Sequence, residues 1–458
     1  MEKKDFSGHV VVFAFPFGTH VTPLFSIINR IASLSPDTHF SFFCTLKANN
    51  SVVAKYSSQP NVKICDLSDG IPDGFVFSSG NNLQEIELFM EAAPLSFRDG
   101  IKAAVAETGK EITCLVTDAF FGFMAEMAEE MTVPWFACWT AAAISVSCHF
   151  YTDFIRDTFG AAGKEESLNL IPGMSKVQIS DLPEGILFGN LDSIISQMLH
   201  KMGKSLPKAD AVFINSFEEL DPIITNDLKS KFKQLLNTGP FNLISPPILS
   251  TPPDPYGCIP WLNNQKPQSV VYVSFGTVAT PPPHELLALS QAFEAIKIPF
   301  LWSLKDDART NLPDGFIDRT ESQGIVVPWT PQIEVLSHGA VGVFLTHCGW
   351  NSVVESIQGG VPMICRPFFG DQRLNGRLVQ DVLEIGVQVE AGGLTQNGVL
   401  DCLDIVFGQD KGKKLTENVT LLKQVVHRAI QPQGSSYSNL IELTKLVTNA
   451  QLQSMNFV

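Results

Sequence analysis

The side chains best suited to chemistry are concentrated between residues 329 and 372. Within this segment, the apolar run 342–346 predicts a buried strand that leads through the motif HCGWNS into a helix. The free N–H groups and the dipole of a helix N-terminus favour a bound diphosphate at such a turn. His347, Asn351 and Ser352 can donate further hydrogen bonds to phosphate oxygens, although ordinary helix capping is the other interpretation of Asn351 and Ser352.

A second chemical pair lies in the N-terminal half. His20 follows the apolar run 9–15, and Asp118 ends the apolar run ITCLVTD. Parallel strands end at one edge of a sheet, so a hydrogen bond between these two side chains is geometrically reasonable. An imidazole, with an unperturbed pKa of about 6.5, suits the removal of a hydroxyl proton. The carboxylate would fix the tautomer of the ring and stabilise the imidazolium.

The elements that must position these groups follow an alternating pattern. Short apolar runs alternate with helix-length amphipathic stretches, which predicts the α/β class with parallel sheets. Two doubly wound domains facing across a cleft are expected, with ligands outside the carboxyl ends of the strands. The expected strands are 9–15, 40–44, 112–117, 134–138 and 211–215 in the first series, followed by a second series at 270–275, 299–303, 324–327, 342–346 and 362–366; a helix is expected at 119–131.

Composition narrows the classes of function. The 458 residues, 45% hydrophobic and 17% charged, suit two globular domains. A net charge of −15 argues against nucleic acid and against a polybasic membrane contact. The nine scattered cysteines contain no CxxC pair and fit a reducing cytoplasm, and no apolar run predicts a membrane span. The first strand leads into no GxGxxG turn, which argues against a Rossmann oxidoreductase.

The 44 residues from Trp329 to Gln372 resemble the signature box of plant UDP-glycosyltransferases of secondary metabolism, in length and in both end residues. The motifs FPFGTH, CLVTDAF, SVVYVSFGT and RPFFGDQRLN extend the resemblance to the flavonoid 3-O-glycosyltransferase branch. It implies a GT-B architecture with two Rossmann-like domains. The expected division is an acceptor-binding domain 1–240, a proline-rich linker 241–257, a UDP-sugar-binding domain 258–432 and a C-terminal helix 433–458 that can pack back on the first domain.

The resemblance also implies roles in donor binding. Trp329 stacks on uracil, Thr330 and Gln332 lie beside the base, and Glu355 accepts hydrogen bonds from ribose hydroxyls. A terminal Gln in this family commonly accompanies glucose and a His galactose, so Gln372 favours UDP-glucose. The other donor-binding residues are expected to be Thr19, Thr140, Thr280, Ser303, His347, Trp350, Asn351, Ser352 and Asp371. Since no Asp-x-Asp pair occurs, we expect transfer without a metal.

The acceptor side of the resemblance is less complete. Acceptor-lining positions correspond to Phe17, Phe120, His149 and Phe369, with Gln84 as a polar contact; for the phenylalanines a plain core role is the competing interpretation. Two features depart from the family pattern near this site. Gly122 stands where a Trp is usual, and residues 142–144 read Ala-Ala-Ile where Gly-Pro and a polar residue are usual.

The sequence therefore predicts an inverting enzyme with His20 as base and Asp118 as its partner. It transfers glucose from UDP-glucose to a hydroxyl, the 3-OH, of a flavonoid such as a flavonol or anthocyanidin. The alternatives are another UDP-sugar, another small phenolic acceptor, or a silent ligand-binding homologue. We further expect a cytoplasmic monomer with no permanently bound cofactor.

Overall fold

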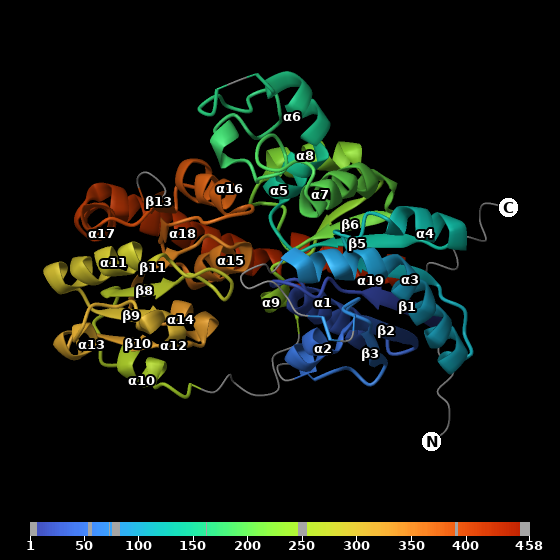
Figure 1. Cartoon of the computed structure of the whole chain (residues 1–458), viewed down its shortest axis with the longest axis horizontal. Coiled ribbons are helices and arrows are strands. Elements are labelled where there is room, and N and C mark those ends of the chain that lie inside the picture. Colours follow the sequence, from blue (N-terminus) through green and yellow to red (C-terminus); the bar gives the residue numbers. More distant parts are fainter. Residues whose placement is uncertain are drawn as a thin grey trace. The chain divides into compact units, whose positions relative to one another are not determined.

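Two parallel β-sheets organise the described part of the chain, and helices flank each of them (Figure 1). The structure is a computed structural model and describes residues 7–53, 57–72, 74–75, 83–161, 163–245, 254–389 and 393–448. The chain divides into two units. The first comprises Met1–Ala161, Gly185–Leu249 and Ala429–Val458, and the second Ala162–Glu184 and Ser250–Arg428.

The sheet of the first unit has the strand order β3-β2-β1-β4-β5-β6-β7 within the described residues, and every pairing is parallel. The chain order reverses between β1 and β4, which makes this the switch point of a doubly wound sheet. The strands are β1 Gly8–Phe13, β2 Thr38–Thr45, β3 Val62–Leu67, β4 Cys114–Asp118, β5 Trp135–Trp139, β6 Ala211–Ile214 and β7 Leu235–Asn237.

Helices cover both faces of this sheet, because its central strands are apolar on both sides. Val10 and Val12 point into a core shared with α1, while Phe13 on the opposite face stacks on Phe97 of α3 at 3.9 Å between ring centroids. The helices of this unit are α1 Val21–Leu34, α2 Leu46–Val53, α3 Leu83–Thr108, α4 Met124–Met131, α5 Ala143–Phe150, α6 Thr152–Phe159, α7 Ile194–Ser205, α8 Pro222–Lys231, α9 Phe241–Ile244 and α19 Ser435–Thr448, with short 3₁₀ turns at Ile179–Asp181 in the second unit and Leu206–Lys208 in the first.

The C-terminal helix α19 belongs to the core of the first unit. Leu440, Leu443 and Val447 are fully buried there, and the Cys114 thiol donates to the Val447 carbonyl at 3.4 Å. The Asn439 amide donates to the Asn237 carbonyl at 3.0 Å. The last described helix is therefore attached to the first sheet although the second unit precedes it in the chain.

The division into units differs from the expected domain ranges in two places. Phe241 and Ile244 of α9 are buried in the first core, so the expected linker 241–257 begins inside that unit. The segment Ala162–Glu184 groups with the second unit. Arg377 fixes it there, because the guanidinium pairs with Asp181 at 2.7 Å and donates to Gln178 at 2.8 Å.

The sheet of the second unit has the order β10-β9-β8-β11-β12-β13 within the described residues, with its switch point between β8 and β11. The prediction of an α/β protein with two doubly wound sheets is thus confirmed. The strands are β8 Val270–Ser274, β9 Phe300–Ser303, β10 Gly324–Val327, β11 Val341–Thr346, β12 Met363–Cys365 and β13 Gly386–Gln388. The helices are α10 Cys258–Leu262, α11 Pro283–Ile296, α12 Asp306–Arg309, α13 Phe316–Arg319, α14 Gln332–Ser337, α15 Trp350–Gly359, α16 Gln372–Arg377, α17 Gln396–Gly408 and α18 Asp410–Ala429. A π-helical turn lies at Leu378–Val382.

Two kinds of expectation about elements were wrong. The helix expected at 119–131 begins only at Met124, because the Asp118 side chain accepts the Phe120 N–H and holds residues 119–123 in a turn. Strands β3, β7 and β13 were not expected. They are short or lie at a sheet edge, and β3 is half exposed, so their sequences lack a strong apolar run.

A buried ion pair ties three segments of the second unit together. The Arg366 guanidinium follows β12 and forms two hydrogen bonds with the Glu285 carboxylate of α11, one of them 2.8 Å long. Glu285 also accepts the Leu394 N–H at 3.1 Å, and Arg366 donates to the Pro367 carbonyl at 2.7 Å. Because both side chains are buried, neither charge can be solvated by water if its partner is removed.

We expect Glu285→Ala to destabilise the second unit by about 3–5 kcal/mol, because it leaves the Arg366 charge buried and unpaired. Denaturant unfolding followed by circular dichroism measures this loss. The matched control is Lys413→Ala, which removes an ion pair with Asp410 that is exposed to solvent, and it should leave the transition unchanged. Equal effects of the two substitutions would contradict a special role for the buried pair.

Candidate active site

His20 and Asp118 meet at the switch point of the first sheet. His20 immediately precedes α1 after the loop that follows β1, and Asp118 is the last residue of β4, the neighbour of β1. The imidazole Nδ1 lies 2.8 Å from Asp118 Oδ2. The other carboxylate oxygen, Oδ1, accepts the Phe120 N–H at 3.0 Å. Both oxygens of this buried carboxylate are thus engaged, which fixes its orientation toward the ring.

This geometry sets the protonation pattern of a neutral His20. A carboxylate accepts hydrogen bonds, so Nδ1 carries the proton and Nε2 keeps the basic lone pair. The His20 side chain is 20% exposed, whereas that of Asp118 is 1% exposed. Thr140 Oγ1 also lies 3.3 Å from His20 Nδ1. An accessible ring nitrogen backed by a buried carboxylate is the arrangement of a general base.

Aromatic side chains surround this pair. The Phe120 ring centroid lies 4.5 Å from that of His20, and Phe15, 5.3 Å from His20, connects the ring of Phe17 to the same group. Phe120 contacts Trp139, whose ring lies 5.8 Å from His149. Three predicted acceptor-lining residues, Phe17, Phe120 and His149, therefore belong to one aromatic cluster around His20. Burial lowers the pKa of His149 to about 4, so its ring is neutral at pH 7.

The remaining sequence-predicted residues of this side are placed differently. Gln84 lies in the first turn of α3, and Thr19 is exposed in the loop after β1. Phe369 belongs to the second unit, where half of its surface is exposed.

Gly122 lies against the backbone of α7. A β-carbon at this position would be 3.2 Å from backbone atoms of Lys201 and Met202. A Trp at position 122 would therefore require α7 to shift, so the departure from the family pattern reflects a close approach of that helix. In the other departing segment, the Ala142 carbonyl accepts the Trp139 indole N–H at 3.0 Å.

The predicted donor residues of the second unit follow five neighbouring strands at their carboxyl ends, and therefore lie along one edge of the sheet. Trp329 is 43% exposed, which leaves an indole face open to a ligand, whereas Thr330 is buried. By strand, the residues are Thr280 after β8, Ser303 at the end of β9, Trp329, Thr330 and Gln332 after β10, His347, Trp350, Asn351, Ser352 and Glu355 after β11, and Asp371 and Gln372 after β12.

A hydrogen-bond network joins four of these positions through Tyr272. The buried Tyr272 hydroxyl lies 2.7 Å from Thr330 Oγ1 and donates to Gln332 Oε1 at 2.9 Å. The Gln332 amide then donates to Ser352 Oγ at 3.0 Å and to Glu355 Oε2 at 2.7 Å. Sequence reasoning missed Tyr272, because its partners are 58 and 60 residues away and nothing in the strand VVYVS marks a polar role.

Burial raises the pKa of Glu355 to about 7, and the hydrogen bond from Gln332 opposes this rise. The carboxyl group is therefore poised between its two protonation states at neutral pH. Hydroxyl groups of a ligand that donate to the carboxylate would favour its charged form.

His347 is wedged between two glycines at the switch point of the second sheet. A β-carbon at Gly276 would lie 2.8 Å from the imidazole Nε2, and one at Gly349 only 2.4 Å from it. Burial lowers the pKa of His347 to about 4, so the ring is neutral at pH 7. Gly349 also precedes α15 as a cap without a side-chain hydrogen bond, and the N–H groups and dipole of a helix N-terminus favour an anion.

Gln372 is fixed by the loop that precedes α16. Its Oε1 accepts the backbone N–H groups of Phe368 at 2.8 Å and Phe369 at 3.3 Å. The amide Nε2 is then the end of this side chain that can donate to a ligand. Asp371 directly precedes α16 and is partly exposed.

No cluster of three or more His, Cys, Asp or Glu side chains could hold a metal ion in the part of the chain that the structure describes. Of the helices that the structure describes, none is long and apolar enough to cross a membrane.

The protein has two Rossmann-like sheets. A His–Asp pair lies at the carboxyl ends of strands in the first, and a helix N-terminus suited to a diphosphate follows a strand of the second. This combination defines the class of GT-B glycosyltransferases. The chain belongs to the UDP-glycosyltransferase family, because the family described as UDP-glucoronosyl and UDP-glucosyl transferase matches residues 44–433.

Individual proteins of known name support the same assignment. The chain is 55% identical over 454 residues to an anthocyanidin 3-O-glucosyltransferase of Vitis vinifera, covering 98% of this chain and 99% of the relative. It is 52% identical to a flavonol 3-O-glucosyltransferase of Arabidopsis thaliana, with 96% and 97% covered. A crystal structure of a UDP-glucose:anthocyanidin 3-O-glucosyltransferase in complex with UDP superposes with a TM-score of 0.92 at 40% identity, with 98% of this chain and 100% of that chain covered.

The network around Gln332 predicts a change in the titration of Glu355. Replacing Gln332 by Leu removes a hydrogen bond that favours the charged carboxylate, so the pKa of Glu355 should rise further above about 7. Carbon-13 NMR of glutamate-labelled protein measures this titration, and Glu355→Gln identifies the signal. A pKa that stays in place or falls in the Leu variant would show that the hydrogen bond does not act on the carboxylate.

Proposed function

We propose that this enzyme transfers glucose from UDP-glucose to the 3-hydroxyl of a flavonoid, a flavonol or anthocyanidin, with inversion at the anomeric carbon. The observation that carries the chemistry is the hydrogen bond of 2.8 Å between His20 and the buried Asp118. The acceptor class is supported by the names of relatives that are 52–55% identical over nearly the full chain.

In this proposal His20 Nε2 accepts the proton of the acceptor hydroxyl. The hydroxyl oxygen attacks the anomeric carbon of glucose, and the bond from that carbon to the β-phosphate oxygen breaks in the same displacement. The proton resides on the imidazole, and the bonding electrons leave with UDP. Asp118 stabilises the imidazolium through Nδ1, and because Phe120 also holds this carboxylate, the ring needs no reorientation during the step.

The donor half of the proposal binds the diphosphate with neutral groups and the rest of UDP-glucose with aromatic, amide and carboxylate side chains. Trp329 stacks on uracil beside Thr330 and Gln332, and Glu355 in its charged form accepts hydrogen bonds from the ribose hydroxyls. The diphosphate is bound at the N-terminus of α15 by His347, Asn351 and Ser352, with Thr280 nearby in the loop after β8. The glucose hydroxyls are bound by Trp350, Asp371 and Gln372, and Thr19, Thr140 and Ser303 contribute polar groups.

The acceptor half uses the aromatic cluster around His20. Flat phenolic rings pack well on Phe17 and Phe120, and the neutral His149 adds a polar edge. Gln84 and Phe369 complete the proposed set. The approach of α7 to Gly122 favours a cavity shape that differs from that of relatives with Trp at this position, so another small phenolic acceptor or another UDP-sugar is the second candidate. A silent homologue is disfavoured because the His20–Asp118 pair is intact.

We also propose that transfer needs no divalent metal, since the helix N-terminus and neutral donors can stabilise the departing diphosphate electrostatically. The protein is further proposed to act as a cytoplasmic monomer. The scattered free cysteines support a reducing compartment.

A donor-by-acceptor matrix tests the proposed function. Purified protein is incubated with UDP-glucose, UDP-galactose and UDP-xylose against flavonols, anthocyanidins and simple phenols, with and without EDTA, and the products are identified by mass spectrometry and NMR. We expect a flavonoid 3-O-β-glucoside as the main product, unaffected by EDTA. Glycosylation at another hydroxyl, a clear preference for another sugar, or loss of activity with EDTA would each contradict one part of the proposal.

We expect His20→Ala to lower kcat by about 10²–10⁴-fold, because it removes the general base, while UDP still binds with unchanged affinity in calorimetry. The matched control is His200→Ala. His200 forms a similar ion pair with Asp153 at 2.5 Å on the surface of the same unit, and its loss should leave kcat unchanged. Near-normal turnover by His20→Ala would exclude this residue as the base.

A further inference from the structure

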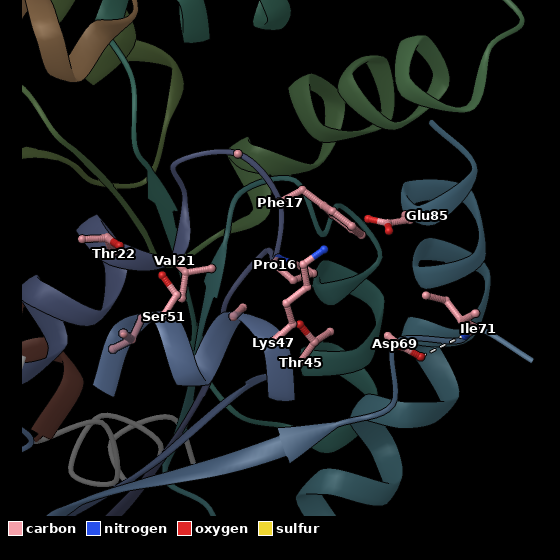
Figure 2. A pocket seen from close by; sticks show the side chains of 13 residues that line it. Pro16, Phe17, Val21, Thr22, Thr45, Lys47, Ser51, Asp69, Ile71 and Glu85 are labelled. Atoms are coloured by element: carbon pink, nitrogen blue, oxygen red, sulfur yellow. Dashed lines mark hydrogen bonds between the residues drawn. The ribbon is translucent and has the colours of Figure 1, made fainter. Parts of the chain in front are cut away.

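A cavity of about 220 Å³ opens beside the loop that carries His20 (Figure 2). It lies at the carboxyl ends of β1 and β2, between that loop, α2 and the first turn of α3. Phe17, Val21 and Ile71 supply apolar walls. The polar lining consists of Thr22, Thr45, Lys47, Ser51, Asp69 and Glu85. Of all lining residues, only Phe17 belongs to the proposed acceptor set.

The size of the cavity indicates a subsite. Pockets that enclose a whole drug-sized ligand measure about 300–1,000 Å³. The cavity is smaller than such pockets, and its size suits one six-membered ring with its substituents.

The lining chemistry favours an uncharged, polyhydroxylated ring. Lys47 forms no ion pair among the described residues, and its side chain extends from α2 toward Pro16 and Phe17 (Figure 2). The Glu85 carboxylate lies beside the Phe17 ring (Figure 2). Asp69 accepts the Ile71 N–H at 3.0 Å. One ammonium, two carboxylates and three hydroxyl groups offer both donors and acceptors, which suits sugar hydroxyls. A charged group of either sign would meet a like charge in the lining.

The cavity lies close to the catalytic base. Gly18 lines it, and a β-carbon at Gly18 would be 3.8 Å from His20 Cδ2. Gly18 adopts a positive φ of 62°, a conformation that favours glycine. Without a side chain at this position, a ligand can pass over the backbone from the cavity to the imidazole. One molecule could thus place a ring in the cavity and present a hydroxyl group to His20.

We propose that this cavity is a subsite for a hexose that the acceptor already carries, so that the enzyme also glucosylates flavonoid monoglucosides. The inference rests on the proposed function, because it uses the same base and donor. The sugar hydroxyls would bond to Lys47, Glu85 and Thr45, while one face of the sugar packs on Phe17, as apolar C–H faces of sugars pack on aromatic rings.

Steady-state kinetics with matched acceptors test the subsite. The acceptors are one flavonol and its 5-O-, 7-O- and 4′-O-monoglucosides, all with UDP-glucose. We expect at least one monoglucoside to react with a kcat/KM within tenfold of that of the aglycone. Lys47→Met, which removes a charged hydrogen bond, and Ser51→Phe, which fills the cavity, should each lower that value about tenfold. The kcat/KM for the aglycone should change less than twofold.

The control variant is Lys102→Met, which removes an exposed lysine on α3 that pairs with Asp99 and does not line the cavity. This substitution should change kcat/KM for neither the aglycone nor the monoglucoside. Two outcomes would contradict the hexose subsite. One is an equal loss of kcat/KM for the aglycone and the monoglucoside in the cavity variants. The other is a changed preference of these variants among flavonols that differ in B-ring hydroxyls. The absence of turnover with all three monoglucosides alongside a reactive aglycone would overturn the inference and leave the proposed function intact.

Direct binding separates the two proposals further. Methyl β-D-glucopyranoside is added to the UDP-loaded protein, and saturation-transfer NMR detects its contact. We expect a signal that Lys47→Met and Ser51→Phe abolish and that Gln372→Ala, in the proposed donor-sugar site, retains. This result would support the subsite even if no flavonoid were glucosylated. A signal lost only in Gln372→Ala, or no signal, would count against it.

Discussion

The parallel pairing of β1 with β4 is the constraint on which the geometry of the His20–Asp118 pair depends. Phe13 pairs with Thr117 in this register, so the two strands end level and Asp118 faces the loop that carries His20. A separation of 98 residues in sequence thereby becomes a hydrogen bond of 2.8 Å. The second unit repeats the principle, since Thr346 of β11 pairs with Ser274 of β8 and brings His347 against Gly276.

The electrostatic surroundings of the His20–Asp118 pair differ from those of the predicted donor residues in the second unit, for a physical reason. Around His20, one buried carboxylate is fully engaged by hydrogen bonds, which would stabilise a positive charge on the imidazole in the proton transfer that we propose. In the second unit, burial keeps His347 neutral and brings the pKa of Glu355 to about 7. In the proposed donor site, an anionic diphosphate would rely on helix N–H groups and neutral donors.

Close backbone approaches give the sites their shape. Gly276 and Gly349 admit the His347 ring, Gly122 admits the backbone of α7, and Gly18 lines the cavity beside His20 without a side chain. Each of these positions would be blocked or narrowed by a single β-carbon or a larger group. The buried ion pair of Arg366 and Glu285 also supports the second unit's site. It anchors the end of β12, and the loop that follows holds the backbone N–H groups that orient Gln372.

The sequence by itself determined the fold class, the central strands and the residues at strand ends, because buried parallel strands and a 44-residue box leave strong local patterns. Weak edge strands such as β3, the turn at 119–123 and the attachment of α9 to the first core left no such pattern. Only the tertiary structure decided the partners of Tyr272, the contact of Gly122 with α7 and the cavity beside Lys47. These features join residues far apart in the chain, so they depend on how elements pack and not on local periodicity.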